Sequence, residues 1–226
     1  MSRTKQRILV VNPNSNEAVT RGIDAALQPL RYAEGPEIAC MTLAEGPFGI
    51  ETQADVESVT LPLARLMRET NDTDAFIIAC YSDPGLHVCR EATDRPVFGI
   101  AECGVLTALA RAETFGVIAI KDRSIPRHIR YLRQMGLMDR LAGERALGLS
   151  VAETASGGST LQRMTDVGTA LRDEDGARAI VMGCAGMAAH RKNLEDRLGI
   201  PVIDPTQAAA TMALGTVALA AAALAA

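Results

Sequence analysis

Short runs of apolar residues without polar alternation recur along the chain, and they limit what it can fold into. They lie at residues 8–11, 75–80, 96–100, 115–120, 179–184 and 201–204. A strand with one solvent-facing side alternates apolar and polar residues, whereas a strand covered on both faces of a parallel sheet is apolar throughout. These runs therefore predict buried strands of parallel sheets.

Helix-like stretches separate the predicted strands. They lie at residues 17–30, 55–70, 84–93, 105–113, 125–136 and 187–199, and several end in Gly or are followed by Pro. Gly and Pro are common where helices stop. The regular alternation of strand and helix predicts an α/β architecture.

The final segment, residues 207–226, carries no charge and approaches the length of a membrane span. Ala and Gly dominate it, and strong hydrophobes are sparse. Small side chains let a helix pack closely against its neighbours. We therefore expect an Ala-rich helix that packs on a sheet, and no membrane partner.

Three predicted strands of the first half resemble three of the second half, in the same order. IIAC ending at Cys80 resembles VMGC ending at Cys184, RPVFGI resembles IPVID, and RILVVN resembles FGVIAIK more loosely. Such internal similarity indicates two related units. We expect two similar Rossmann- or flavodoxin-like lobes with parallel sheets, related by pseudo-two-fold symmetry. The boundaries would be 1–100, completed by the helix 206–226, and 101–205, with the active site in the cleft between the lobes.

Composition argues against several kinds of partner. Of the 226 residues, 48% are hydrophobic and 22% are charged, as in an ordinary globular protein. A net charge of -4 gives no support for nucleic-acid binding. Aromatic residues make up 3% and Trp is missing, which argues against stacking platforms for bases. A small-molecule substrate is the partner that we expect, and symmetric homo-oligomers are common among soluble enzymes.

The cysteines and histidines show no spacing typical of a metal site. The five cysteines contain no CxxC pair, and the histidines have no ligand spacing. The N-terminal apolar run is too short for a signal peptide, so we expect a cytoplasmic chain with free thiols. The sequence contains no GxGxxG, GK[ST] or GxSxG motif. We therefore expect no metal and no cofactor.

Two cysteines, Cys80 and Cys184, stand at the last apolar position of a predicted strand. Ligands in open α/β sheets bind beyond the carboxyl ends of the strands. After Cys80, Asp83 and Pro84 have the types favoured at an N-cap and at the first helical position, and a helix is expected from Met187 after Cys184. The positive potential of a helix N-terminus would favour thiolate over thiol and stabilise a developing oxyanion.

The equivalence of the two positions favours a chemical role for these cysteines over simple packing. A buried cysteine alone is usually a small hydrophobe, and we interpret Cys89 and Cys103 in that way. Two thiols on opposite sides of a substrate suit proton transfer instead of disulfide chemistry, because one can remove a proton from carbon while the other returns one. That reaction is racemisation or epimerisation without a cofactor.

Five motifs resemble the hydantoin and allantoin racemases, a branch of the aspartate/glutamate racemase superfamily. They are NPNSN at 12–16, ACYSDPGL at 79–86, PVFGIAE at 96–102, GCAGM at 183–187 and PVID at 201–204. The resemblance implies a two-lobed α/β fold with a site between the lobes and a cofactor-free two-thiol mechanism. It places the catalytic cysteines at Cys80 and Cys184.

The resemblance also implies which residues bind the substrate. The Asn-Pro-Asn loop falls on 12–14, with Asn14 reaching the substrate. The loops after the cysteines supply N–H groups for substrate carbonyls, and a loop at 46–52 borders the pocket. The substrate-binding residues are therefore expected to be Asn14, Tyr81, Ser82, Ala185, Gly186, Ile50 and Glu51.

One departure from the family bears on the substrate. Many relatives carry a Thr-Thr-Leu run where this chain has Ala119, Ile120 and Lys121. Losing two hydroxyls would weaken polar contacts to a hydantoin ring, and Lys121 at a strand end would favour a carboxylate. The alternative interpretation is that Lys121 starts a solvated segment.

The sequence thus supports an isomerase, specifically a racemase of a cyclic ureide such as a 5-substituted hydantoin or allantoin. An alternative is an isomerase, decarboxylase or hydrolase of the same superfamily that acts on a carboxylate-bearing substrate, like maleate isomerases or amino-acid racemases. A third hypothesis is a catalytically silent binding protein, which ordinary thiol pKa values at both cysteines would favour.

Overall fold

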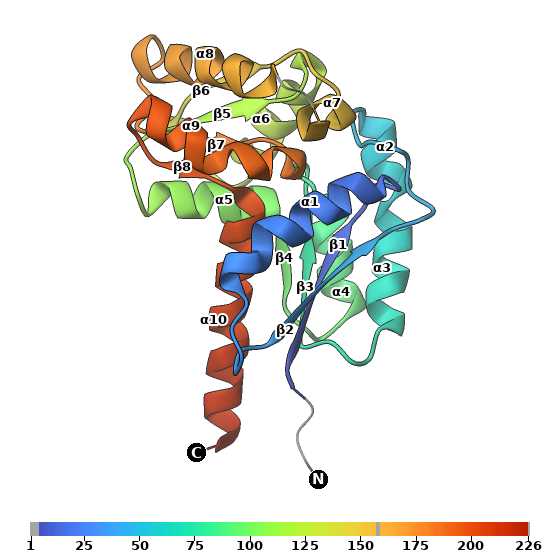
Figure 1. The fold of residues 1–226 in the computed structure, drawn as a ribbon. Helices are drawn as coiled ribbons and strands as arrows, with labels where there is room; N and C mark the ends of the chain where they lie inside the picture. The colour runs from blue at the N-terminus through green and yellow to red at the C-terminus, as the bar shows by residue number, and fades with distance from the viewer. Residues whose placement is uncertain (1–4, 157–158, 226) are drawn as a thin grey trace.

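Two four-stranded parallel sheets form the framework of the protein (Figure 1). The computed structural model describes residues 5–156 and 159–225. The first sheet contains β1 (Arg7–Asn12), β2 (Glu37–Thr42), β3 (Ala75–Ile78) and β4 (Val97–Gly99), and the second contains β5 (Phe115–Ala119), β6 (Leu141–Ala146), β7 (Ala179–Met182) and β8 (Val202–Ile203). Each sheet is the centre of one lobe, so the predicted α/β fold with two lobes is confirmed.

The two sheets have the same topology. Their strand orders are β2-β1-β3-β4 and β6-β5-β7-β8, and every pairing is parallel. The predicted correspondences become β1 with β5, β3 with β7, and β4 with β8. All three are confirmed, because the matched strands hold equivalent places in their sheets. This order is the flavodoxin-like one, in which the strands next to the switch point deliver residues to a ligand.

The sequence patterns miss one strand in each lobe, β2 and β6. Both lie at the edge of their sheet, and most of their residues are only partly buried. Edge strands carry mixed polar and apolar residues because one side faces solvent. The sequences EIACMT and LAGERA therefore lack the apolar run that reveals the central strands.

Ten α-helices among the described residues connect and cover the strands. They are α1 (Glu17–Leu27), α2 (Gln53–Ser58), α3 (Thr60–Glu69), α4 (Leu86–Ala92), α5 (Ile100–Leu109), α6 (Ile125–Gln134), α7 (Val151–Ser156), α8 (Thr160–Asp173), α9 (Arg191–Leu198) and α10 (Pro205–Ala225). The stretch 55–70, predicted as one helix, is two helices, α2 and α3, that meet at Val59. A proline near the start of α3, Pro62, is tolerated in a first turn.

Two further differences concern helices. Neither α7 nor α8 was predicted, and α5 begins five residues before the predicted start at 105. The buried face of α8 is formed by Thr160, Met164, Gly168 and Leu171, and two of these residues are not apolar enough to mark a stripe. Helix α5 is apolar around most of its circumference because it lies between the two lobes, so it lacks the amphipathic pattern.

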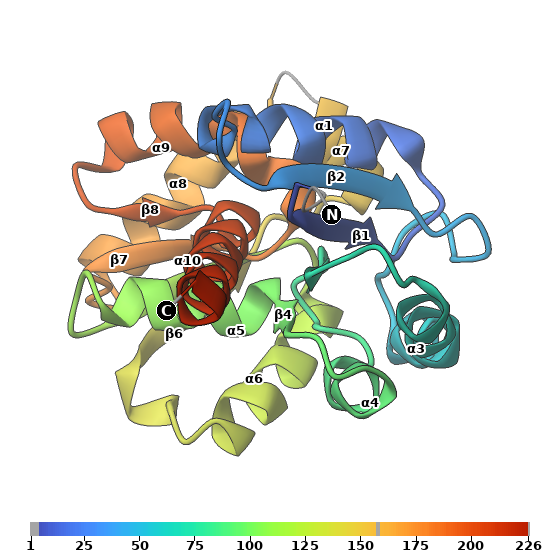
Figure 2. The same cartoon turned by 90° about the horizontal axis from the view of Figure 1, so that it is seen from below.

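Helix α10 belongs to the chain's second half but runs alongside the first lobe (Figures 1 and 2). It packs on α5 and contacts β3 and β4. A methyl group on Gly104 of α5 would lie 2.9 Å from a Pro205 side-chain carbon, so the close approach requires glycine there. By length and composition alone, 205–223 could also span a membrane; its first half is nevertheless buried at Ala209, Ala210 and Ala213.

Candidate active site

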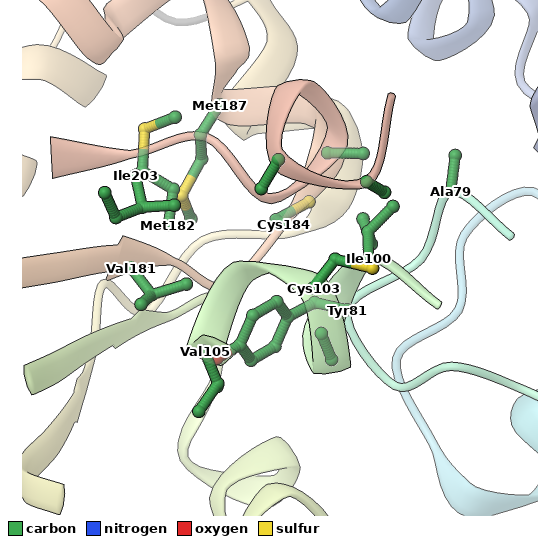
Figure 3. Packing of buried hydrophobic residues seen from close by; sticks show 14 of the residues in the cluster. Ala79, Tyr81, Ile100, Cys103, Val105, Val181, Met182, Cys184, Met187 and Ile203 are labelled. Carbon is green, nitrogen blue, oxygen red and sulfur yellow. The ribbon is translucent and has the colours of Figure 1, made fainter. Parts of the chain in front are cut away.

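The carboxyl ends of β3 and β7 deliver Cys80 and Cys184 into one cavity between the lobes. The cavity has an empty volume of about 420 Å³ and is lined by both cysteines and by the loops that follow them. Buried residues from both lobes meet here around α5, with Tyr81 from one lobe and Cys184 from the other (Figure 3). The two strand-end thiols thus line one cavity, which is the arrangement that the internal repeat predicts.

The backbone around the two cysteines follows the same hydrogen-bond pattern. The residue before each cysteine donates to the neighbouring strand: Ala79 N–H lies 2.9 Å from the Val11 oxygen, and Gly183 N–H lies 2.9 Å from the Ile118 oxygen. A turn then follows, in which Asp83 and Met187 donate to the cysteine carbonyls at 2.9 and 3.2 Å. Both thiols are therefore presented by the same local geometry.

Each sulfur also receives one backbone hydrogen bond. The N–H of Ser82 donates to the Cys80 sulfur, and the N–H of Gly186 donates to the Cys184 sulfur. These two N–H groups, which were predicted to hold substrate carbonyls, contact the thiols in this structure. The N–H groups of Tyr81 and Ala185 precede them, and Ala185 begins a helical segment, where a first N–H has no intrahelical partner. All four residues line the cavity.

Burial dominates the acidity of both thiols. It raises the pKa of Cys80 to about 12, despite the hydrogen bond from Ser82 and the positive charge of Arg127. Burial likewise raises the pKa of Cys184. The N–H groups of Ser82 and Gly186 lower the two pKa values, as expected, but loss of hydration outweighs them, so the thiol form is favoured at both cysteines.

Alkylation of Cys80 by iodoacetamide should accelerate about tenfold per pH unit from pH 7 to pH 10 without levelling off. The reason is that only the thiolate reacts, and its fraction grows tenfold per unit at any pH below the pKa. Mass spectrometry of the peptide containing Cys80 measures the rate, with glutathione as the control thiol. A plateau below pH 9 would contradict the raised pKa.

The turn after Cys80 differs from the predicted helix start. Helix α4 begins at Leu86, after Gly85 in a left-handed conformation, so Asp83 is not its N-cap. Instead the Asp83 carboxylate accepts hydrogen bonds of 2.9 Å from Ala101 N–H and from Glu102 N–H at the start of α5. Asp83 itself has a positive φ of 41°. It thereby ties the Cys80 loop to the helix between the lobes.

The segment after Cys184 also differs from the prediction. It forms a 3-10 helix, η4 (Ala185–His190), and α9 begins only at Arg191. Thr154 of α7 lies beneath it, with its hydroxyl 3.9 Å from the Cys184 sulfur and donating to the Val151 carbonyl at 2.7 Å. Because that single proton is used on Val151, the hydroxyl oxygen can accept from the Cys184 S–H.

The Asn-Pro-Asn loop brings Asn14 to the cavity wall. Asn14 is buried, and its side-chain oxygen accepts from Asn16 N–H at 3.0 Å and from the Asn12 amide at 3.1 Å. Since a backbone N–H can only donate, the oxygen assignment of Asn14 is fixed by its contact with Asn16. Within residues 5–156 and 159–225, its amide nitrogen has no protein acceptor, so it can donate to a ligand.

Glu51 and Lys121 lie outside the cavity lining and pair with each other across the lobes. Glu51 accepts from Lys121, from Arg123 at 2.7 Å and from Val151 N–H at 3.2 Å. Partial burial alone would raise the pKa of Glu51, but these donors lower it overall. The ammonium of Lys121 therefore has a protein carboxylate as its partner. Ile50, the neighbour of Glu51, does line the cavity.

Three polar residues at the cavity escaped the sequence patterns: Ser124, Arg127 and His128 of the segment that includes α6. The His128 ring contacts the Tyr81 ring edge-on at 5.1 Å and is paired with Glu144 at 2.5 Å. The sequence KDRSIPRHIRYLR suggests a solvated basic helix. Only its amphipathic period, which places Arg127, His128 and Leu132 on the buried side, could have indicated that two charged residues face inward.

Potential metal ligands do not gather at the site or elsewhere in the described chain. Across residues 5–156 and 159–225, no three His, Cys, Asp or Glu side chains form a group that could hold a metal ion. His128, the histidine at the cavity, has Glu144 and the Tyr81 ring as its neighbours.

Similar proteins support the same interpretation. A hydantoin racemase of Paenarthrobacter aurescens is 40% identical over 94% of this chain and 92% of its own length. A hydantoin racemase of Pseudomonas sp. (strain NS671) is 35% identical over 88% of this chain and 80% of its own length. The solved structure of an allantoin racemase from Klebsiella pneumoniae has a TM-score of 0.89 and 33% identity, covering 96% of this chain and 89% of that one.

The expectation of an isomerase, specifically a racemase, is confirmed by these relatives. The sequence profile of the family described as Asp/Glu/Hydantoin racemase matches residues 8–213, which include both lobes and both cavity cysteines. By this match and by identities of up to 40% over nearly its whole length, the chain belongs to the Asp/Glu/hydantoin racemase family.

Proposed function

We propose that this enzyme racemises a cyclic ureide, a 5-substituted hydantoin or allantoin, without a cofactor and with Cys80 and Cys184 as its two bases. One observation carries the proposal: two strand-end thiols from opposite lobes line the same cavity. Relatives named as hydantoin and allantoin racemases support the choice of substrate class.

The proposed reaction needs one thiolate and one thiol at a time. The thiolate takes the proton from C5 of the ring, and the electron pair left on carbon spreads onto the neighbouring carbonyl oxygen. The thiol of the opposite lobe then gives its proton to the other face of C5. Each turnover exchanges the protonation states of Cys80 and Cys184, so the enzyme is ready for the opposite enantiomer.

The surroundings of the thiols suit this chemistry in two ways. Burial makes each thiolate a stronger base than a free cysteine, and base strength helps to remove a proton from carbon. The N–H groups of Tyr81 and Ala185 and the amide nitrogen of Asn14 are donors at the cavity wall that can stabilise the enolate oxygen. Ile50, Ile120 and Val151 give part of the cavity wall an apolar surface, which strengthens such hydrogen bonds.

Racemisation in heavy water tests the proposal directly. A single enantiomer of a 5-substituted hydantoin or of allantoin should lose its optical rotation and gain one solvent deuterium at C5. In a two-base mechanism the product enantiomer carries deuterium from the outset, because the returning proton comes from the second thiol, which exchanges with solvent. Polarimetry and mass spectrometry of the same samples measure both rates.

Two outcomes would contradict the proposal. A product whose mass differs by more than the one deuterium gained would indicate a hydrolase or decarboxylase instead. Unchanged rotation without deuterium uptake, across hydantoins, allantoin, aspartate and glutamate, would contradict racemisation by proton transfer at carbon. Boiled enzyme is the control for spontaneous racemisation.

A further inference from the structure

Arg127 of α6 is a buried cation on the wall of the active-site cavity. Only 9% of its surface is exposed. Its Nε donates a 2.9 Å hydrogen bond to the Ser82 hydroxyl, which lies in the loop after Cys80 on the opposite lobe. In the described part of the chain, the two terminal guanidinium nitrogens have no hydrogen-bond partner. They are therefore available to something that occupies the cavity.

No carboxylate of the described residues contacts Arg127, although Asp55 and Glu144 act on its charge from a distance. Among the residues described, it takes part in no ion pair, and the cavity lining contains no Asp or Glu. His128, the next residue, shows the contrast because Glu144 contacts its ring at 2.5 Å. Burial lowers the pKa of Arg127, and the negative charges of Asp55 and Glu144 offset this only in part. An unpaired charge in such a place is costly, and a bound anion would remove much of that cost.

We propose that Arg127 binds a carboxylate carried by the substrate's C5 substituent, so that the preferred substrates are hydantoins with an acidic side chain. This inference rests on the proposed function and adds the substrate class. Ser82 fixes the guanidinium through Nε and leaves the two terminal nitrogens as a fork. That fork matches the two oxygens of a carboxylate.

A second, wider cavity indicates where the substituent would extend. It has an empty volume of about 890 Å³ and adjoins the first, since Tyr81, Ser82, Arg127 and His128 line both. The acidic residues along it are Glu57 and Asp83. Asp83 is bound by the N–H groups of Ala101 and Glu102, and Glu57 is bound by Gln53. Arg130 also lines this cavity, but it donates to Gln53 at 2.8 Å. Arg127 lines both cavities and is therefore the cation that an anionic substituent reaches at their junction.

Isothermal titration with a matched pair of probes tests the assignment. Racemic hydantoin-5-acetic acid and its amide differ in charge but hardly in shape, and racemic probes undergo no net turnover. Wild-type enzyme should bind the acid about 10- to 100-fold more tightly than the amide, as expected for a charge-assisted contact. Arg127→Met should abolish this preference, and Arg127→Lys should restore part of it as a point charge.

The outcomes separate this inference from the proposed function. No preference for the acid in the wild-type enzyme overturns the inference, whether or not any variant folds. An Arg127→Met variant that weakens acid and amide equally also overturns it, because Arg127 would then serve the Cys80 thiolate or general packing. Polarimetry on both probes tests racemisation separately. A preference for the acid that depends on Arg127, without any racemisation, would support the inference about Arg127 and contradict only the proposed reaction.

Discussion

Replacing Cys80 or Cys184 by Ser should lower the racemisation rate by about 10³-fold or more, while leaving the fold unchanged. A serine hydroxyl is far less acidic than a thiol, so it supplies neither the base nor the ready acid, and general acid–base groups contribute about 10²- to 10⁴-fold each. Circular dichroism spectra and thermal midpoints close to those of the wild type would show that the cavity is retained. Polarimetry with a single hydantoin enantiomer measures the activity.

A third cysteine provides the matched control for these variants. Cys89 of α4 is fully buried in an apolar cluster of the first lobe and does not line the cavity. Cys89→Ala should keep the racemisation rate within about threefold of wild type and act mainly on stability. If Cys80→Ser and Cys184→Ser both racemise at the rate of this control, the two-base mechanism is wrong.

Asp83→Ala should reduce the free energy of unfolding by about 2–4 kcal/mol and lower the racemisation rate as well. The carboxylate accepts from two N–H groups at the start of α5, Ala101 and Glu102, and both would lose their partner in a buried place. The neighbouring Gly99 leaves the space for this contact, since a methyl group there would lie 2.3 Å from the carboxyl carbon. Urea denaturation followed by circular dichroism measures the loss.

The pH dependence of that loss has a definite sign. Burial raises the pKa of Asp83 in the folded protein from 3.8 to about 7. A raised pKa means that folding favours the protonated carboxyl, so its contribution is largest below pH 4 and declines as the pH rises through 7. The difference between wild type and Asp83→Ala should be larger at pH 5 than at pH 8. As a control, Asp173→Ala removes a surface carboxylate paired with Arg172 and should change stability by less than about 0.5 kcal/mol.

The strands that could be predicted from sequence are those whose burial alone determines which residues they contain. Central strands β1, β3, β5 and β7 are covered on both faces, so their residues are apolar and recognisable. The edge strands β2 and β6 face solvent on one side and contain Glu, Thr and Arg. Helix α8 was missed because Thr160 and Gly168 occupy its buried face. In each missed element the buried surface is shared among residues of mixed polarity.

Within the site, the sequence indicated the residues whose position follows from the backbone. Cys80 and Cys184 end matched strands, and Asn14 follows β1 in the loop that the family motif marks. The pairing of Glu51 with Lys121 could not be anticipated, because the partners lie 70 residues apart and meet only when the lobes close on each other. Asp83 likewise caps a helix other than the one it precedes.

The sequence by itself determined the two-lobed α/β fold and the presence of equivalent thiols at two strand ends. Both could be predicted because buried strands and internal repeats are recognisable from short stretches of sequence. The tertiary structure alone decided the electrostatics of the cavity. Whether a thiol is acidic or basic, or a charge is paired or free, depends on which groups from distant segments surround it and exclude water. Arg127 and His128 are neighbours in a basic stretch, yet one is unpaired in the cavity and the other is held by Glu144.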